Sequence, residues 1–214
     1  MRNIPVFTTQ YGVASLILES IPNRQEAFIQ IQSSIEPEKL LRECREFCIA
    51  CGAERIYAAG DAMLEQYPFH MSLLQMNVSK ETVGETDASL VPVQEKTAEQ
   101  WRQIYNEKMA AVPKAAYLTA FAMKRVLKEG DAYFVHRNGV LLGIGMAGGN
   151  RIDAVASVVP GMGAEVVRAL CQVLVDNAIT LEVASTNERA IRLYEKLGFR
   201  AVREVTKWYC VYAK

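Results

Sequence analysis

The stretch EVASTNERAIRLYEKLGFRAVRE, residues 182–204, has the strongest local structural signals in this chain. Four apolar side chains recur along it at the spacing that lines one face of an α-helix: Ala190, Ile191, Tyr194 and Leu197. Ser185 followed by Glu188 fits a capping box at the start of this helix. Gly198 followed by Phe199 fits a Schellman stop with its hydrophobic contact. The stretch therefore predicts a strand, a short and well-anchored helix, and a further strand.

The segment before it has the layout of an anion-binding turn. VASVVPGMGAEVVRALCQVL, residues 155–174, leads from a β-rich run through the turn Pro160–Gly163 into an amphipathic helix. The first N–H groups of a helix have no intrahelical acceptor, and glycines leave them unobstructed, so such a turn can hold a phosphate or pyrophosphate. Glycine is also used simply to turn the chain, and the spacing alone leaves both interpretations open.

A second glycine pattern matches the dinucleotide-binding fingerprint G-x-G-x-x-G letter for letter. It lies in LLGIGMAGGN, residues 141–150, and consists of Gly143, Gly145 and Gly148. A working fingerprint follows a strand and opens a helix. Here the glycines lie within a predicted strand, and the next segment, RIDAVASVV, is predicted to be another strand. The context argues against a dinucleotide site and favours a bulge or a close approach of backbone groups.

The order of predicted elements indicates an α/β fold of mixed α+β type. Residues 1–84 are predicted to form a β-β-α-β lobe, with its helix near residues 38–51. The polar stretch NVSKETVGETDA, residues 77–88, is typical of a linker. Residues 88–214 follow the order β-α-α-β-β-β-α-β-α-β-β. Because both parts place a hairpin before a helix and a strand, the lobe is expected to be a degenerate half-copy of this second domain.

The bulk composition excludes several classes of protein. Lys and Arg number 24, as do Asp and Glu, so there is no net charge to attract nucleic acid or an anionic membrane, and neither is expected as a partner. The start, MRNIPVFTTQYG, lacks the regions of a signal peptide. No apolar run approaches the roughly 20 residues that span a bilayer. We expect a soluble cytoplasmic protein, and the sequence leaves open whether it forms a homodimer.

Three of the five cysteines, Cys44, Cys48 and Cys51, have the spacing C-x3-C-x2-C of iron–sulfur enzymes that perform radical chemistry. Together with Leu41, however, they recur at +3, +4 and +3, which is one face of a helix. A free cysteine packs as a small hydrophobic side chain. Periodicity therefore explains all three as core residues, and no metal site is expected.

The strand, glycine turn and two helices together closely resemble the GNAT family of N-acetyltransferases. The most recognisable segment of that family has the form N-x-x-A-x-x-L-Y-x-K-x-G-F, matched here by Asn187, Ala190, Leu193, Tyr194, Lys196, Gly198 and Phe199. The resemblance covers about residues 89–212. It implies a twisted, mostly antiparallel mixed sheet flanked by helices, acetyl-CoA as co-substrate, and a primary amine of a small molecule or peptide as acceptor.

The resemblance also implies roles for individual residues. The thioester would lie in a gap between two splayed strands, residues 151–159 and 179–185. Tyr194 matches the tyrosine that acts as general acid, and Asp153 lies on the strand that commonly carries the general base. The alternatives to these catalytic roles are structural: Tyr194 would be a core aromatic residue, and Asp153 a solvated carboxylate on the strand. Acetyl-CoA would be held by the strand, the glycine turn and the second helix: Ala156, Ser157, Val158, Gly161, Met162, Gly163, Ala164, Asn187, Ala190 and Tyr194.

The glycine turn departs from the family's form, Q/R-x-x-G-x-G/A. Its first residue corresponds to Val158, which is neither polar nor basic, and the turn Pro160–Gly163 is several residues shorter. Two hypotheses therefore remain: an active acetyltransferase, and a module of the same fold that senses an acyl-CoA or pairs with a partner after losing catalysis. Acceptor specificity is expected to come from the helices near residues 101–126 and from the lobe.

Neither histidine of the chain is expected to be catalytic. His70 lies in the loop-like YPFHM and His136 beside a hairpin turn, so exposed or capping roles are expected for both.

Overall fold

The computed structural model describes residues 5–113 and 115–214, and the chain divides into two compact units. The first unit consists of two segments, the chain up to Leu73 and Val205–Lys214. The second unit consists of Leu74–Glu204. The division falls inside a strand rather than in the polar stretch 77–88. That stretch begins as strand because Met76 and Val78 are buried while Asn77 between them points to the other face.

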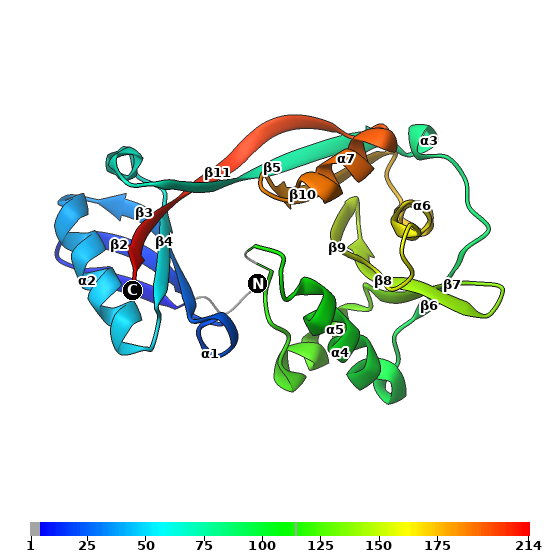
Figure 1. Cartoon of the computed structure of the whole chain (residues 1–214), viewed down its shortest axis with the longest axis horizontal. Helices are drawn as coiled ribbons and strands as arrows, with labels where there is room; N and C mark the ends of the chain where they lie inside the picture. Colours follow the sequence, from blue (N-terminus) through cyan, green and yellow to red (C-terminus); the bar gives the residue numbers. More distant parts are fainter. Residues whose placement is uncertain (1–4, 114) are drawn as a thin grey trace. The chain divides into compact units, whose positions relative to one another are not determined.

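The first unit is a sheet with one crossover helix (Figure 1). Its elements are β1 (Val6–Thr9), β2 (Gly12–Ile17), α1 (Ile21–Arg24), β3 (Glu26–Ser34), α2 (Pro37–Ala50), β4 (Arg55–Ala59), η1 (Ala62–Gln66), the beginning of β5 (Phe69–Ser79) and the end of β11 (Arg200–Ala213). Strands pair in the order β1-β2-β3-β4-β11. The β3–β4 pair is parallel because α2 carries the chain back across the sheet, and the other three pairs are antiparallel.

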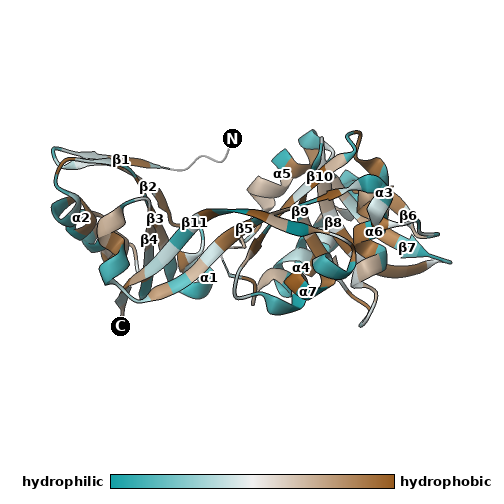
Figure 2. Cartoon of the chain, turned by 90° about the horizontal axis from the view of Figure 1, so that it is seen from above, coloured by the Kyte–Doolittle hydropathy of each residue, from teal (hydrophilic) through white to brown (hydrophobic). Residues whose placement is uncertain are grey.

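Helix α2 confirms most of the interpretation of the cysteines. Leu41, Cys44 and Cys48 are buried against the sheet, and burial raises the pKa of both thiols to about 12. The visible outer side of this helix is hydrophilic (Figure 2). Cys51 is not a core residue as predicted, because the helix ends at Ala50 and the side chain of Cys51 is exposed. The described residues include no cluster of His, Cys, Asp or Glu that could hold a metal ion.

The second unit carries a larger mixed sheet with helices on both faces. Its elements are the end of β5, α3 (Lys80–Val83), β6 (Ser89–Pro92), η2 (Glu95–Thr97), α4 (Ala98–Met109), α5 (Ala120–Glu129), β7 (Ala132–Arg137), β8 (Val140–Gly148), β9 (Arg151–Ser157), α6 (Gly163–Val173), β10 (Ala178–Ala184), α7 (Glu188–Lys196) and the beginning of β11. Strands pair in the order β5-β10-β9-β8-β7-β6. Helices α4 and α5 pack on one face, and α6 and α7 on the other.

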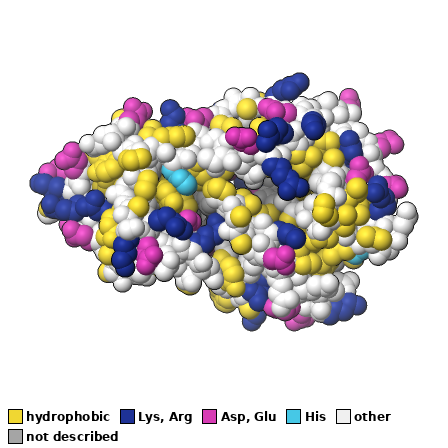
Figure 3. Space-filling model, in the orientation of Figure 1, with side chains coloured by type: hydrophobic (Ala, Val, Ile, Leu, Met, Phe, Trp, Pro, Cys, Tyr) yellow, Lys and Arg dark blue, Asp and Glu magenta, His cyan; other side chains and the backbone are white. Residues whose placement is uncertain are grey.

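These features confirm the mixed α+β fold and the flanking helices, with two local corrections. The sequence predicts two closing strands, but the chain ends in one long strand, β11. In addition, no strand was predicted for residues 69–79, where the structure has β5, the neighbour of β10. None of the helices formed by the described residues is long and apolar enough to cross a lipid bilayer. Acidic and basic side chains both occur across the face drawn in Figure 3, in keeping with the zero net charge.

The glycines of residues 141–150 serve helix packing. They lie in β8, and the next element is β9, not a helix. A Cβ atom on Gly143 would lie 2.7 Å from Val166 Cγ2, and one on Gly145 would lie 2.3 Å from Leu170 Cδ1. Both glycines therefore let α6 approach the strand closely, as the interpretation of a close approach predicts.

Candidate functional site

The parallel strands β9 and β10 pair only at their beginnings. Arg151 and Ile152 pair with Thr180 and Leu181, and no further pair of these strands is formed in the part of the chain that the structure describes. The next residue of β9, Asp153, is a bulge, because Met146 faces Ala154 while Ala147 faces Ile152 on β8. A bulge bends its strand and increases the local twist. It accounts for a gap that opens between β9 and β10 from this point onward.

The register of β8 and β9 decides which backbone groups face this gap. The N–H of Val158 donates to the carbonyl of Leu142 at 2.9 Å, so Val158 points toward β8. Because antiparallel pairs alternate between bonded and non-bonded positions, Ala156 also points toward β8, and the N–H and C=O groups of Ser157 and Val155 point toward the gap. Of the three strand residues predicted to pair with a pantetheine arm, Ser157 is the one so oriented.

The glycine turn and the start of α6 lie at the end of β9. Gly161 has a φ of +83°, which favours glycine, and a Cβ atom there would have nothing within 4 Å. Gly163 packs against α7, where a Cβ atom would lie 3.0 Å from Leu193 Cδ2. The N–H groups of Gly163, Ala164 and Glu165 have no hydrogen-bond acceptor among the described residues. The turn thus presents three unpaired donors at the positive end of an 11-residue helix.

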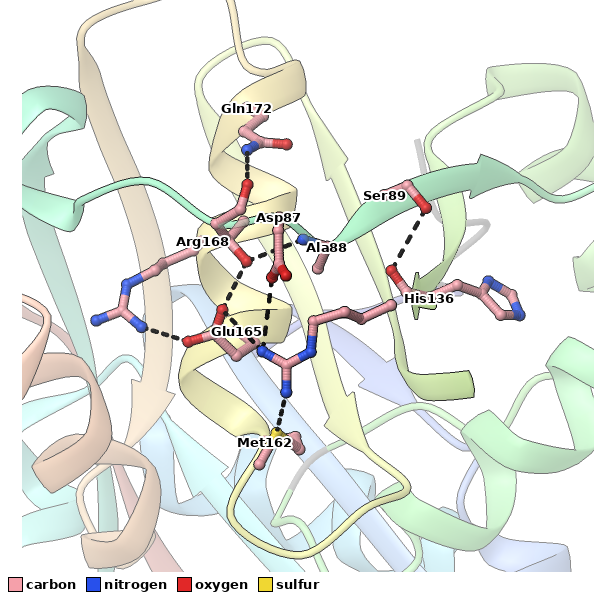
Figure 4. Close-up of polar contacts among 10 residues, drawn as sticks. Asp87, Ala88, Ser89, His136, Met162, Glu165, Arg168 and Gln172 are labelled. Atoms are coloured by element: carbon pink, nitrogen blue, oxygen red, sulfur yellow. Dashed lines mark hydrogen bonds and ion pairs between the residues drawn. The ribbon is translucent and has the colours of Figure 1, made fainter. Parts of the chain in front are cut away.

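A charged network surrounds this helix start (Figure 4). Glu165 accepts hydrogen bonds from Arg168 Nη1 and Thr86 Oγ1, each at 2.6 Å. Arg137, at the end of β7, places Nη1 3.6 Å from Asp87 Oδ1 and 4.0 Å from Glu165 Oε2. Its Nη2 lies 3.4 Å from the sulfur of Met162, inside the glycine turn. A guanidinium group therefore reaches the turn from another strand, although Val158 offers no basic side chain.

Helix α7 begins later than the capping box predicts. Its N-cap is Asn187, whose Oδ1 accepts from the N–H of Ala190 at 3.3 Å. The prediction of Ser185 as the cap is wrong, because the chain first makes a turn in which the N–H of Asn187 donates to Ala184. Asn187 and Ala190, both predicted to contact acetyl-CoA, thus bond to each other and set the start of the helix.

The end of α7 fixes Tyr194. The N–H of Phe199 donates to the carbonyl of Tyr194, and the N–H of Gly198 to that of Glu195, both at 3.0 Å, which is the predicted Schellman motif. The rings of Tyr194 and Phe199 lie 5.7 Å apart. Burial raises the pKa of Tyr194 to about 12, so the phenol keeps its proton throughout the neutral range. Its hydroxyl forms no hydrogen bond with any described residue.

Asp153 lies at the closed end of the gap. Its Oδ1 is 2.6 Å from Arg151 Nη2, and its side chain is about one-third exposed, at 38%. Burial, with the charges of Glu129 and Asp153, raises the pKa of the neighbouring Asp131. Asp153 is therefore one member of a charged cluster near the β8–β9 hairpin.

Sequence reasoning missed a second carboxylate, Glu182. On β10, Ile179, Leu181 and Val183 pack with α6 and α7, so Glu182 points to the opposite face. It is exposed, it follows the last residue paired with β9, and it bonds to no described residue. The signal was available, because ITLEVAS places one acidic residue within an otherwise apolar alternation.

The histidines take other places. His70 lies on β5, not in a loop, and stacks on Tyr57 in the first unit with ring centroids 4.0 Å apart. Burial lowers its pKa. His136 lies near the end of β7, next to the hairpin turn as predicted.

Comparisons with known proteins agree with this fold. A family model described as FR47-like protein matches residues 159–209, the glycine turn through β11. A GCN5-related N-acetyltransferase from Sphaerobacter thermophilus has a similar structure, with a TM-score of 0.54, 13% identity, and coverage of 94% of this chain and 76% of that one. A conserved protein of unknown function from Staphylococcus epidermidis reaches a TM-score of 0.61 at 11% identity, covering 98% and 94%. No curated protein matches the sequence.

Proposed function

Because the chain contains an FR47-like region of the GNAT type at residues 159–209 and has the fold of GNAT acetyltransferases, we propose that it transfers the acetyl group of acetyl-CoA directly to a primary amine. One observation carries the proposal. The gap between β9 and β10 opens beside a helix start with three unpaired N–H donors, and a protonated tyrosine is fixed on the adjacent helix. A small molecule or a peptide supplies the amine.

The residues present fit acetyl-CoA. The N–H groups of Gly163, Ala164 and Glu165 would bind its pyrophosphate, and Gly161 leaves open space in front of them. The charge of Glu165 is already balanced by Arg168. Arg137 supplies the positive charge that the family's loop takes from the position of Val158. The backbone groups of Ser157 and Val155 would pair with the pantetheine arm.

Acetyl-CoA supplies an acetyl group activated as a thioester. The chain's own groups then act on opposite faces of the sheet, since Glu182 points away from α7, which carries Tyr194. Glu182 is the favoured general base: it takes one proton from the attacking amine as the C–N bond forms. Tyr194 donates one proton to the sulfur as the C–S bond breaks. The proton held by Glu182 is released to solvent, and Tyr194 takes a proton from solvent, so both groups return to their starting states. Asp153 stays a second candidate base, but Arg151 already holds it.

The alternative is a module that binds an acyl-CoA without catalysis. The observation in its favour is Val158, which removes a polar side chain from a turn that is already short. The two functions share the binding site and differ only in the chemistry at Glu182 and Tyr194.

Isothermal titration calorimetry and an acetyl-transfer assay distinguish them. We expect CoA and acetyl-CoA to bind, and a panel of primary amines to be acetylated by the wild-type protein. Glu182→Gln should keep acetyl-CoA binding and lower kcat about 100-fold, the order expected for loss of a general base. Binding without transfer to any amine would favour the module. Absence of binding at millimolar ligand would refute both.

A further inference from the structure

The face of β10 and β5 opposite α6 and α7 carries polar side chains. Met76 and Val78 of β5 belong to the same buried cluster as Ile179 and Leu181 of β10. Side chains alternate along a strand, so the residues between them point to the other face. In β5 these include Gln75 and Asn77, and in β10 they include Glu182.

Two of these polar residues, Gln75 and Glu182, form a row with Arg203 across three strands. The N–H of Lys80 donates to the carbonyl of Asn177 at 2.8 Å, so the end of β5 lies beside the start of β10 and the strands are antiparallel. Counted from this bond in unbroken register, Gln75 lies opposite Glu182. Both point away from the buried cluster that contains Met76 and Leu181. On β11, the Nε of Arg203 donates to Gln75 Oε1 at 2.6 Å.

The two ends of the row carry opposite charges. Gln75 is engaged on both sides, because its Oε1 accepts from Arg203 and its Nε2 donates to Asn77 Oδ1 at 3.3 Å. Glu182 and the Nη atoms of Arg203 have no partner among the described residues. Neighbouring strands lie about 4.8 Å apart, so the backbones of the two strands that carry Glu182 and Arg203 are separated by roughly 10 Å.

We propose that this row selects an acceptor amine that carries a free carboxylate, with the amine at Glu182 and the carboxylate on Arg203. The proposal rests on the proposed acetyltransferase activity and names its substrate class. An extended chain spans about 3.4 Å per residue, so the two charged ends of a dipeptide or tripeptide lie about 7 to 10 Å apart. The acceptor is therefore a short peptide, acetylated on its N-terminal amine. A planar guanidinium binds a carboxylate through two parallel hydrogen bonds and discriminates against a neutral amide.

The matched probes are trialanine with a free C-terminal carboxylate and trialanine amide, assayed with acetyl-CoA. We expect the wild-type protein to have at least a tenfold higher kcat/KM for the free acid. Arg203→Gln should remove this preference by raising KM for the acid alone, while kcat and the KM for acetyl-CoA stay unchanged. Arg200→Gln is the control, since Arg200 is also exposed on β11 but three residues away, on the opposite face.

Equal kcat/KM for the two peptides, or a preference that survives Arg203→Gln, would overturn the inference and leave the acetyltransferase proposal intact. Acetyl transfer to other amines but to neither peptide would also overturn the inference and leave the acetyltransferase proposal intact. If acetyl-CoA does not bind at all, the proposed function fails first, and calorimetry with acetyl-CoA alone identifies that case.

Discussion

Both units of the molecule contain a parallel strand pair joined by a crossover helix, and only one pair opens. β3 and β4 pair over five positions, from Glu26 with Arg55 to Gln30 with Ala59. β9 and β10 pair over two, and the bulge at Asp153 follows. Each pair has an antiparallel hairpin before it, β1–β2 or β7–β8, so the two frames are alike. Both frames contain a bulge, at Gln32 on β3 and at Asp153 on β9, but the first follows five paired positions and the second only two. The difference is therefore local, in the position of the bulge and in the turn before the helix.

The helix starts differ in the same sense. Helix α2 begins at Pro37, which has no N–H, between Glu36 and Glu38. Helix α2 therefore presents one N–H donor fewer, and no glycine turn precedes it. Helix α6 begins at a glycine turn that leaves its donors free. The first unit thus repeats the frame without the features of the site, as expected of a degenerate copy. That the first unit is such a copy stays a prediction.

The largest effect is expected from the tyrosine of the open unit. Tyr194→Phe removes the proton donor and should lower kcat about 100-fold, with the KM for acetyl-CoA nearly unchanged. Because burial raises the pKa of Tyr194 to about 12, wild-type activity should not decline through ionisation of this phenol below about pH 11. Steady-state kinetics across pH 6 to 10.5 measure both. The control is Tyr57→Phe in the first unit, a tyrosine whose pKa is also raised by burial. Equal turnover in all three proteins would exclude Tyr194 as the acid.

The next effect concerns the glycine turn. A valine at Gly161 must adopt a φ of +83°, which costs roughly 1–3 kcal/mol and distorts the donors before α6. We expect Gly161→Val to raise the KM for acetyl-CoA about tenfold, a loss of about 1.4 kcal/mol in binding. Gly149→Val is the matched control, since Gly149 also has a positive φ and open space around its Cβ position. Both variants should lose similar thermal stability, and only the first should lose affinity. Equal KM values for the two would remove the turn from the site.

Much of the second unit follows from local sequence rules. The helix stop at Gly198 and Phe199 was predicted because a Schellman motif needs only a few consecutive residues. That a strand, not a helix, follows Gly143 and Gly145 was predicted from the β-rich run RIDAVASVV. The predictions that were wrong concern strands whose pairing depends on residues distant in sequence. β5 completes the sheet of the second unit although it begins in the first unit and runs into the polar stretch 77–88, and no local pattern predicts this arrangement.

The same distinction holds for the site. Tyr194 and the glycine turn were predicted as site residues because a motif surrounds them. The row from Glu182 through Gln75 to Arg203 was not, because these residues lie on three strands and meet only through the register of the sheet. The cap at Ser185 was misplaced by two residues, since a turn and a first helical turn have similar sequence requirements.

A smaller effect is expected from the cation that reaches the turn. Arg137→Ala removes a guanidinium that lies 3.4 Å from the sulfur of Met162. We expect the KM for acetyl-CoA to rise about threefold, and the dependence of KM on salt to weaken, because a partly exposed charge contributes about 0.5–1 kcal/mol. Arg125→Ala, which removes a cation from the exposed surface of α5, is the control. Measurement of KM at two salt concentrations tests the prediction, and identical salt dependence in wild type and Arg137→Ala would contradict it.

The smallest effect is expected from the helix start of the closed unit. Lys39 lies in the first turn of α2, but it is paired with Glu36, and β3 and β4 stay paired over five positions. Lys39→Ala should therefore change neither the affinity for acetyl-CoA nor kcat by more than about 1.5-fold, since surface ion pairs contribute little. Calorimetry should give one acetyl-CoA bound per chain in both proteins. A stoichiometry of two, or a loss of one site in Lys39→Ala, would show that the first unit kept a working site, and the difference between β3–β4 and β9–β10 would then not explain where acetyl-CoA binds.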